Sequence, residues 1–88
     1  MKSLKVTIQD PTGLHARPAT LLVKTASSFK STIQIKNPAN AVGNMKSIIN
    51  LLSLSIKQND AIEIIVDGED EDAAIEAIKQ TLTENKLI

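Results

Sequence analysis

The hydrophobic pattern of this chain switches repeatedly between two periods, and this switching constrains the possible folds most. Apolar and polar residues alternate over 4–8, 32–36 and 62–67, a pattern typical of strands with one buried face. Between and after these segments, apolar residues recur at helical spacing within 16–28 and 70–82. We therefore expect strands and helices to be mixed along the chain.

A weaker strand and a short helix complete the predicted order. After a turn at residues 37–40, Ala41 and Val42 can pair back on the preceding strand as a hairpin. Residues 47–55 predict a short helix. The order is then β-α-β-β-α-β-α. Strands with one apolar face predict an α+β open-faced β-sandwich, in which three helices cover one face of a four-stranded antiparallel sheet.

The length and the scarcity of cysteine and histidine narrow the possible chemistry. Eighty-eight residues are enough for one hydrophobic core, so we expect a single domain over 1–88. The chain has no cysteine, which excludes disulfides, thiolate nucleophiles and cysteine zinc sites. It has one histidine, which excludes sites built from several histidines. We predict that the protein uses no metal and no cofactor.

The first residues argue against targeting to a membrane. Residues 1–5 alternate polar and apolar side chains and contain no long apolar run, so we expect neither a signal peptide nor a membrane span. We expect a cytoplasmic monomer.

The net charge of the chain is zero, but its basic and acidic residues are concentrated in different parts of the sequence. Residues 1–57 contain eight lysines and arginines and a single acid, Asp10, a balance of +7 that the remaining residues cancel. A basic segment of this kind indicates an anionic ligand or an acidic partner. The alternative is a charge-separated surface without a function.

The segment Gly-Leu-His-Ala-Arg-Pro-Ala at residues 13–19 carries the most specific chemistry. Gly13 permits a tight turn, and Pro18 falls in the first helical turn, where its missing N–H is not needed. His15 is then the residue that caps the helix. The amides of Ala16 and Arg17 are left free to donate to an anion beside the imidazole.

This position favours a phosphoryl group on His15. The positive end of the helix disfavours an imidazolium, and a neutral ring nitrogen is the nucleophile that phosphoryl transfer requires. Arg17 adds a guanidinium for the phosphoryl oxygens. Thr20 and Lys24 share a helix face with Arg17 and are predicted to flank the site. The alternative is a histidine that only caps a helix. The sequence argues against a serine hydrolase, because no G-x-S-x-G segment is present.

The predicted short helix over residues 47–55 has apolar residues on more than the one face that can pack against a sheet. If Leu51 and Leu54 point inward, then Ile48, Ile49 and Leu52 remain near the surface and form a candidate docking patch. The alternative is that all five belong to the core.

Taken from end to end, the chain resembles HPr, the histidine-containing phosphocarrier family of the bacterial phosphoenolpyruvate-dependent sugar phosphotransferase system. The resemblance rests on residues 13–19 and on Asn-Met-Lys-Ser-Ile at residues 44–48. It implies that Enzyme I phosphorylates Nδ1 of His15, which then donates to the EIIA domains of sugar transporters. It implies no direct contact with nucleic acid.

The second motif resembles the Gram-positive type of the family. By itself, Ser47 is a good helix cap. The resemblance implies that a bifunctional HPr kinase/phosphorylase modifies it in carbon catabolite repression, and that the modified form binds a catabolite-control transcription factor. Ser55 and Asn59 depart from the family, because relatives often have glycine at these two positions.

Two other functions remain for comparison. A regulatory-only HPr paralogue would act through Ser47, but such proteins are expected to lack the acceptor histidine. A small RNA-binding domain would need stacking aromatics, and Phe29 is the only aromatic residue here.

Overall fold

The computed structural model describes residues 1–88, and its elements follow the predicted order. They are β1 (Lys2–Thr7), α1 (Ala16–Ser27), β2 (Thr32–Lys36), β3 (Val42–Asn44), α2 (Ile48–Ser53), β4 (Ala61–Asp67) and α3 (Glu71–Glu84).

The four strands form one antiparallel sheet in the order β1-β4-β2-β3. Ile64 in β4 is opposite Leu4 in β1 and opposite Ile35 in β2, so the three side chains share one face. Ile64 and Ile35 are fully buried, whereas Leu4 is only half-buried. This difference arises because β1 is an edge strand with a neighbour on one side only.

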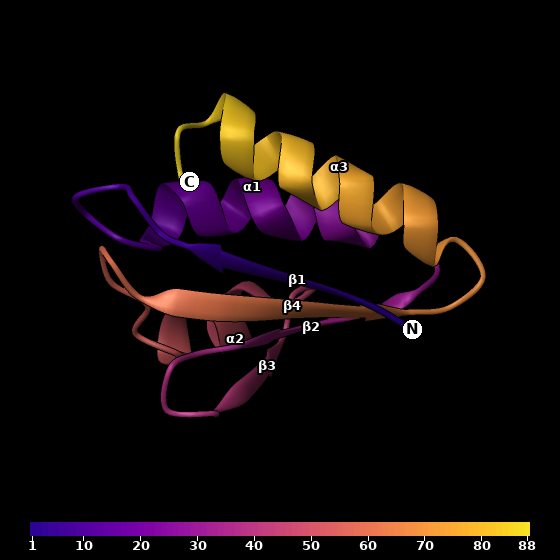
Figure 1. The fold of residues 1–88 in the computed structure, drawn as a ribbon, viewed down its shortest axis with the longest axis horizontal. Helices are drawn as coiled ribbons and strands as arrows, with labels where there is room; N and C mark the ends of the chain where they lie inside the picture. Colours follow the sequence, from indigo (N-terminus) through magenta and orange to yellow (C-terminus); the bar gives the residue numbers. More distant parts are fainter.

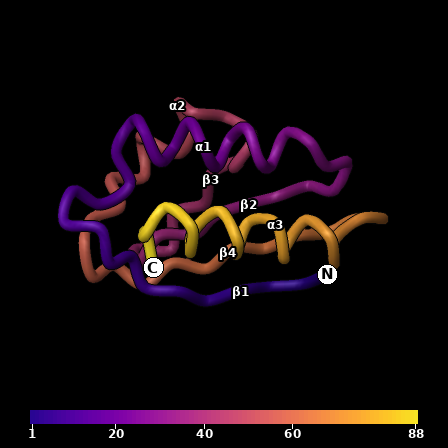
Figure 2. Tube along the Cα trace, turned by 90° about the horizontal axis from the view of Figure 1, so that it is seen from above, coloured from indigo at the N-terminus to yellow at the C-terminus, as the bar shows by residue number.

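Helices α1 and α3 lie side by side along the sheet in Figure 1, and α2 lies next to α1 in Figure 2. Helix α1 packs against both α3 and α2, and α3 also packs on β1 and β4. The helical spacing predicted from the sequence is confirmed. The buried helical residues are Pro18, Ala19, Leu22 and Ala26 of α1, Leu51 of α2, and Ala74, Ile78 and Leu82 of α3. The predicted open-faced α+β sandwich is therefore the observed fold.

The predicted third strand, Ala41 and Val42, began one residue too early and ended too early, because β3 runs from Val42 to Asn44. Ala41 lies in the turn, because its amide donates to Oδ1 of Asn37 (2.9 Å) and Asn40 adopts a left-handed φ of 66°. Pairing begins only with Val42 opposite Lys36 and continues to Asn44.

The short helix is also more compact than predicted. Helix α2 ends at Ser53, because Leu54 is its C-cap and Ser55 adopts a φ of 52°. Asn59, which the sequence marks together with Ser55 as a departure from the family, has a φ of 73°. Both residues are held in the left-handed region that glycine adopts without strain.

The segregated charges meet at one end of the molecule. The Met1 amino group contacts Glu71 (3.0 Å) and Asp67 (3.7 Å), and Lys2 contacts Asp72 (3.3 Å). Part of the acidic segment is thus neutralised by the start of the chain. The loop between β1 and α1 lies at the opposite end, where the chain also terminates (Figures 1 and 2).

Candidate functional site

His15 is the N-cap of α1, as predicted. Its backbone is extended (φ −87°, ψ −172°), and its exposed side chain makes no capping hydrogen bond. The amides of Ala16 and Arg17 donate to no acceptor in the protein, and the first helical hydrogen bond runs from Ala19 N to His15 O (3.0 Å). Pro18, which follows Arg17, has no N–H to donate. Two unpaired amides and the positive end of the helix therefore lie beside the ring.

The turn before His15 is fixed by Asp10 and Gly13. Oδ1 of Asp10 accepts from the Thr12 amide (2.8 Å) and from the Thr12 hydroxyl (2.6 Å), and Gly13 N donates to Asp10 O (2.9 Å). Gly13 has a φ of 68°, and a Cβ there would lie 2.5 Å from Ile56 O. Only glycine fits this close approach, so it sets the direction in which the chain enters α1.

The turn is also attached to the segment that follows α2. Leu14 is 4% exposed, and its amide donates to Ile56 O (3.0 Å). A buried Leu14 next to an exposed His15 anchors the backbone while leaving the ring accessible.

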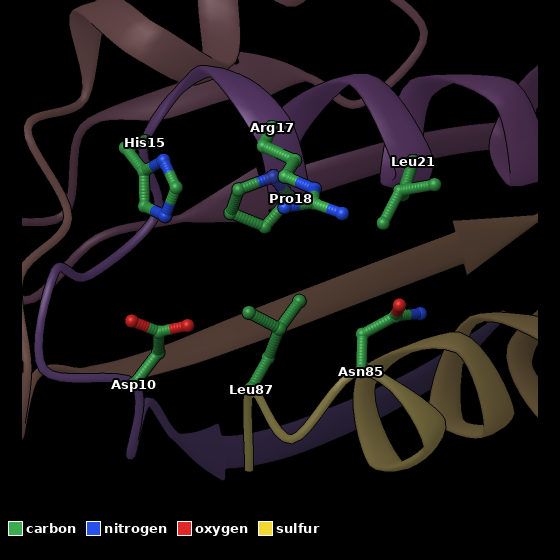
Figure 3. Close-up of a pocket in the computed structure, with 7 residues that line it drawn as sticks. All are labelled: Asp10, His15, Arg17, Pro18, Leu21, Asn85 and Leu87. Atoms are coloured by element: carbon green, nitrogen blue, oxygen red, sulfur yellow. The ribbon is translucent and has the colours of Figure 1, made fainter.

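A hollow of about 300 Å³ opens beside the ring. Figure 3 shows the residues around it, which are Asp10, His15, Arg17, Pro18, Leu21, Asn85 and Leu87. In this view, one nitrogen of the His15 ring lies next to the start of α1, and the other points into the hollow toward Asp10. The hollow gives a tetrahedral anion, or a side chain of a partner, access to the ring.

Besides His15, the hollow is lined by one acidic residue, Asp10, and one basic residue, Arg17. The pKa of Asp10 is held below its ordinary value, chiefly by the hydrogen bond from the Thr12 hydroxyl and then by the one from the Thr12 amide. Partial desolvation opposes this shift. The Arg17 guanidinium is exposed and forms no ion pair within the chain. It is free to contact an anion bound at the head of the helix.

The sequence did not reveal that the C-terminal segment forms part of this site. Gln9 N donates to Leu87 O (2.7 Å), and Leu87 N donates to Leu82 O (2.9 Å), so the chain folds back beneath the β1–α1 loop. The contribution of Asp10 was also missed. Its position as the only acid among the first 57 residues was the available signal.

Thr20 and Lys24 are exposed on α1 but do not line the hollow. The Thr20 hydroxyl donates to Ala16 O (2.8 Å) within the helix. The two side chains therefore extend the helix surface beyond the hollow rather than contributing to its wall.

The predicted apolar patch is smaller than expected. Ile49 is 76% exposed and Leu52 is 42% exposed. Ile48 is half-buried and packs against the core, so only part of its side chain reaches the predicted patch. Leu51 and Leu54 point inward, as predicted.

Ser47 is the N-cap of α2. Its Oγ accepts from the Asn50 amide (3.3 Å) and from Nδ2 of Asn50 (3.1 Å), and the residue is half-buried. The capping role expected from the sequence is confirmed.

Together these features define a class: a small open-faced α+β sandwich with an accessible histidine at a helix head whose amides are unpaired. Comparisons with known proteins identify the family. Residues 2–84 match the family model described as the PTS HPr component phosphorylation site. A phosphocarrier protein HPr of Mycoplasma genitalium is 51% identical over 88 residues, which cover all of both chains.

Solved structures agree. A mycoplasma histidine-containing phosphocarrier protein superposes with a TM-score of 0.96 at 46% identity, over 99% of this chain and 98% of that one. Crh, the catabolite repression HPr of Bacillus subtilis, superposes with a TM-score of 0.74 at 35% identity, over all of both chains. The chain belongs to the HPr family, the phosphocarriers of the phosphotransferase system. No helix is long and apolar enough to cross a membrane.

Proposed function

We propose that this phosphocarrier accepts a phosphoryl group from phosphorylated Enzyme I on Nδ1 of His15 and donates it to the EIIA domains of sugar transporters. The observation that carries the proposal is the exposed His15 ring at the head of α1, next to two amides without acceptors. The protein acts as a carrier in the cytoplasm and needs its partners for both transfers.

The chemistry follows from the position of the ring. Attack on phosphorus requires a lone pair on Nδ1, so the ring proton must be on Nε2. Once bound, the phosphoryl oxygens accept from the amides of Ala16 and Arg17 and from the Arg17 guanidinium. The two amides and the guanidinium stabilise the phosphoryl anion by hydrogen bonds alone. The phosphoryl group can therefore still be transferred to a partner.

Partner binding is proposed for the surface around the helix head. Ile49 and Leu52 offer exposed aliphatic contacts, and Thr20 and Lys24 continue this surface along α1. Ile48 supports the patch from below, since it packs against the core. Lys24 and Arg17 give the surface a positive charge that suits an acidic face on Enzyme I or EIIA.

Ser47 is the proposed regulatory site, phosphorylated by an HPr kinase/phosphorylase. Its hydroxyl lies at the head of α2, directly before Ile48 and Ile49. A phosphate adds nearly two negative charges next to the apolar patch, so binding of Enzyme I should weaken. The same phosphate creates a new feature that a catabolite-control transcription factor can recognise.

The test of carrier function uses phosphoenolpyruvate, Mg²⁺ and Enzyme I with the wild-type protein and His15→Gln. Phosphohistidine is labile in acid, so the wild type should acquire an acid-labile phosphate that is missing from His15→Gln. Arg17→Ala should be phosphorylated more slowly. An acid-labile phosphate that persists in His15→Gln would refute the assignment of the acceptor.

The test of regulation uses ATP and an HPr kinase. Wild-type protein should acquire an acid-stable phosphate that Ser47→Ala does not. Ser53→Ala is the matched control, because Ser53 lies on the same helix with its hydroxyl bonded to Asn50 O (2.8 Å). Equal labelling of Ser47→Ala and wild type would contradict the proposal.

A further inference from the structure

The hollow beside His15 contains a carboxylate that the proposed carrier function does not use. Asp10 lies across the hollow from the ring (Figure 3). We propose that Asp10 is a positioning residue that keeps a proton on Nε2 of His15, so that Nδ1 remains the nitrogen that reacts. This inference rests on the proposed role of His15 as the phosphoryl acceptor.

The Asp10 carboxylate is held in a fixed position. Oδ1 of Asp10 accepts from both the amide and the hydroxyl of Thr12, whereas Oδ2 accepts no hydrogen bond from the chain. These two bonds and the turn closed by Gly13 N hold the side chain in one place. They also favour the ionised carboxylate. The hollow therefore has a permanent negative charge on the wall opposite His15.

The His15 ring is oriented with its two nitrogens toward different surroundings. In Figure 3, the nitrogen adjacent to the ring carbon that bears the side chain, Nδ1, lies next to the start of α1, and Nε2 points into the hollow toward Asp10. The helix amides favour a lone pair on the nitrogen next to them. The Asp10 charge favours a proton on the other nitrogen. Asp10 and His15 form no ion pair in the structure, so the effect acts across the hollow or through a water molecule.

The same arrangement serves both directions of transfer. When Nδ1 attacks, the Nδ1–P bond forms, the bond between phosphorus and the donor breaks, and positive charge develops on a ring that retains its Nε2 proton. Asp10 stabilises that charge. When the group is donated, the Nδ1–P bond breaks and its electron pair returns to Nδ1. The Nε2 proton makes the ring a better leaving group, so Asp10 promotes donation as well.

The other charges near the ring differ in role. Arg17 is the second charged residue that lines the hollow and comes from α1, whereas the C-terminal segment contributes the uncharged Asn85 and Leu87. Lys57 lies behind the turn, where its backbone approaches Gly13. Arg17 is thus available for the phosphoryl oxygens, and Asp10 is the only acidic residue that lines the hollow.

The test compares the wild type with Asp10→Asn, which keeps an oxygen acceptor for Thr12 but removes the charge. Asp72→Asn, at the far end on α3, is the matched control. Each protein is phosphorylated chemically with phosphoramidate, and loss of phosphohistidine is followed by ³¹P NMR across neutral pH. The unphosphorylated ring is examined separately by ¹⁵N NMR, which reports the protonation of each nitrogen.

We expect Asp10→Asn to hydrolyse its phosphohistidine about two- to tenfold more slowly, with a pH profile displaced to lower pH, since one charge across a solvated hollow has an effect of this order. Its ¹⁵N shifts should move toward the tautomer protonated on Nδ1. Asp10→Glu, which restores the charge, should return the pH profile toward wild type. Asp72→Asn should match wild type in both measurements.

Equal hydrolysis and equal ¹⁵N shifts for Asp10→Asn and wild type would overturn the inference. A wild-type protein that forms no phosphohistidine would instead refute the proposed carrier function. The ¹⁵N measurement separates these two failures, because it needs neither Enzyme I nor a phosphoryl group.

Discussion

Replacing Gly13 with alanine tests whether the β1–α1 turn positions the site. Gly13 has a φ of 68°, and an added Cβ would lie 2.5 Å from Ile56 O and 2.7 Å from Lys57 Cα. Both neighbours are backbone atoms and cannot rotate away. The turn and the segment over residues 56–57 must therefore separate.

The cost has two parts. Alanine in the left-handed region costs about 1–2 kcal/mol. Separation lengthens the hydrogen bond from Leu14 N to Ile56 O, now 3.0 Å, and losing it costs about 1 kcal/mol more. Gly13→Ala should thus lower the free energy of unfolding by about 2–3 kcal/mol, a large fraction of the roughly 4–13 kcal/mol expected for a domain of this length.

Urea unfolding followed by far-UV circular dichroism measures this change, because the chain has no tryptophan or tyrosine for fluorescence. Ser55→Gly is the control with the opposite geometry, since Ser55 already has a φ of 52°. It should be neutral or stabilising by a few tenths of a kcal/mol, because relief of strain is offset by a more flexible unfolded chain. A loss below about 0.5 kcal/mol for Gly13→Ala, the range typical of surface changes, would refute this reasoning.

Three further predictions concern the rest of the molecule. The pKa of Asp70 is lowered to about 2, chiefly by the Ser31 hydroxyl (2.5 Å), so its ionised form stabilises the fold above about pH 4, and this contribution is lost as the pH falls through about 2. Asp70→Asn should therefore be less stable than wild type in urea at neutral pH, and a gap that does not narrow in acid would contradict the assignment. Ile49→Glu should leave the melting temperature nearly unchanged but weaken Enzyme I binding in calorimetry, whereas Ile48→Glu should melt much lower, because Ile48 packs against the core. Ser47→Ala should lose about 1 kcal/mol of stability in urea unfolding with the cap of α2, and an unchanged midpoint would show that the cap contributes nothing.

Local sequence patterns predicted the seven elements and their order. Strict alternation marked Ile62, Ile64 and Val66 as one buried face, and helical spacing marked Ala74 and Ile78 as another. Each of these patterns arises because one strand or helix packs one face against the core. The sequence of that element alone is therefore enough to reveal its buried face. The start of β3 could not be predicted in the same way, because it depends on a side-chain hydrogen bond of Asn37 within the turn.

The sequence predicted only those residues of the candidate site that are neighbours along the chain. His15, Ala16 and Arg17 are consecutive, so a helix start was enough to bring the ring and the amides together. Leu87 reaches the hollow through a tertiary contact, which single-sequence patterns do not contain. Asp10 is held there by local hydrogen bonds with Thr12 and Gly13, but its position across from the ring depends on how the turn folds. How much of Ile48 reaches the surface could not be predicted for a related reason, because it depends on how α2 packs against the core.

The central claim is that the head of α1 holds a phosphoryl group on His15. The most direct measurement compares amide ¹H–¹⁵N spectra of the unphosphorylated and phosphorylated protein. The amides of Ala16 and Arg17, which have no acceptor now, should move strongly downfield as they bond to phosphoryl oxygens, while the amides of α3 stay in place. Unchanged Ala16 and Arg17 signals in a protein that carries phosphohistidine would contradict the account.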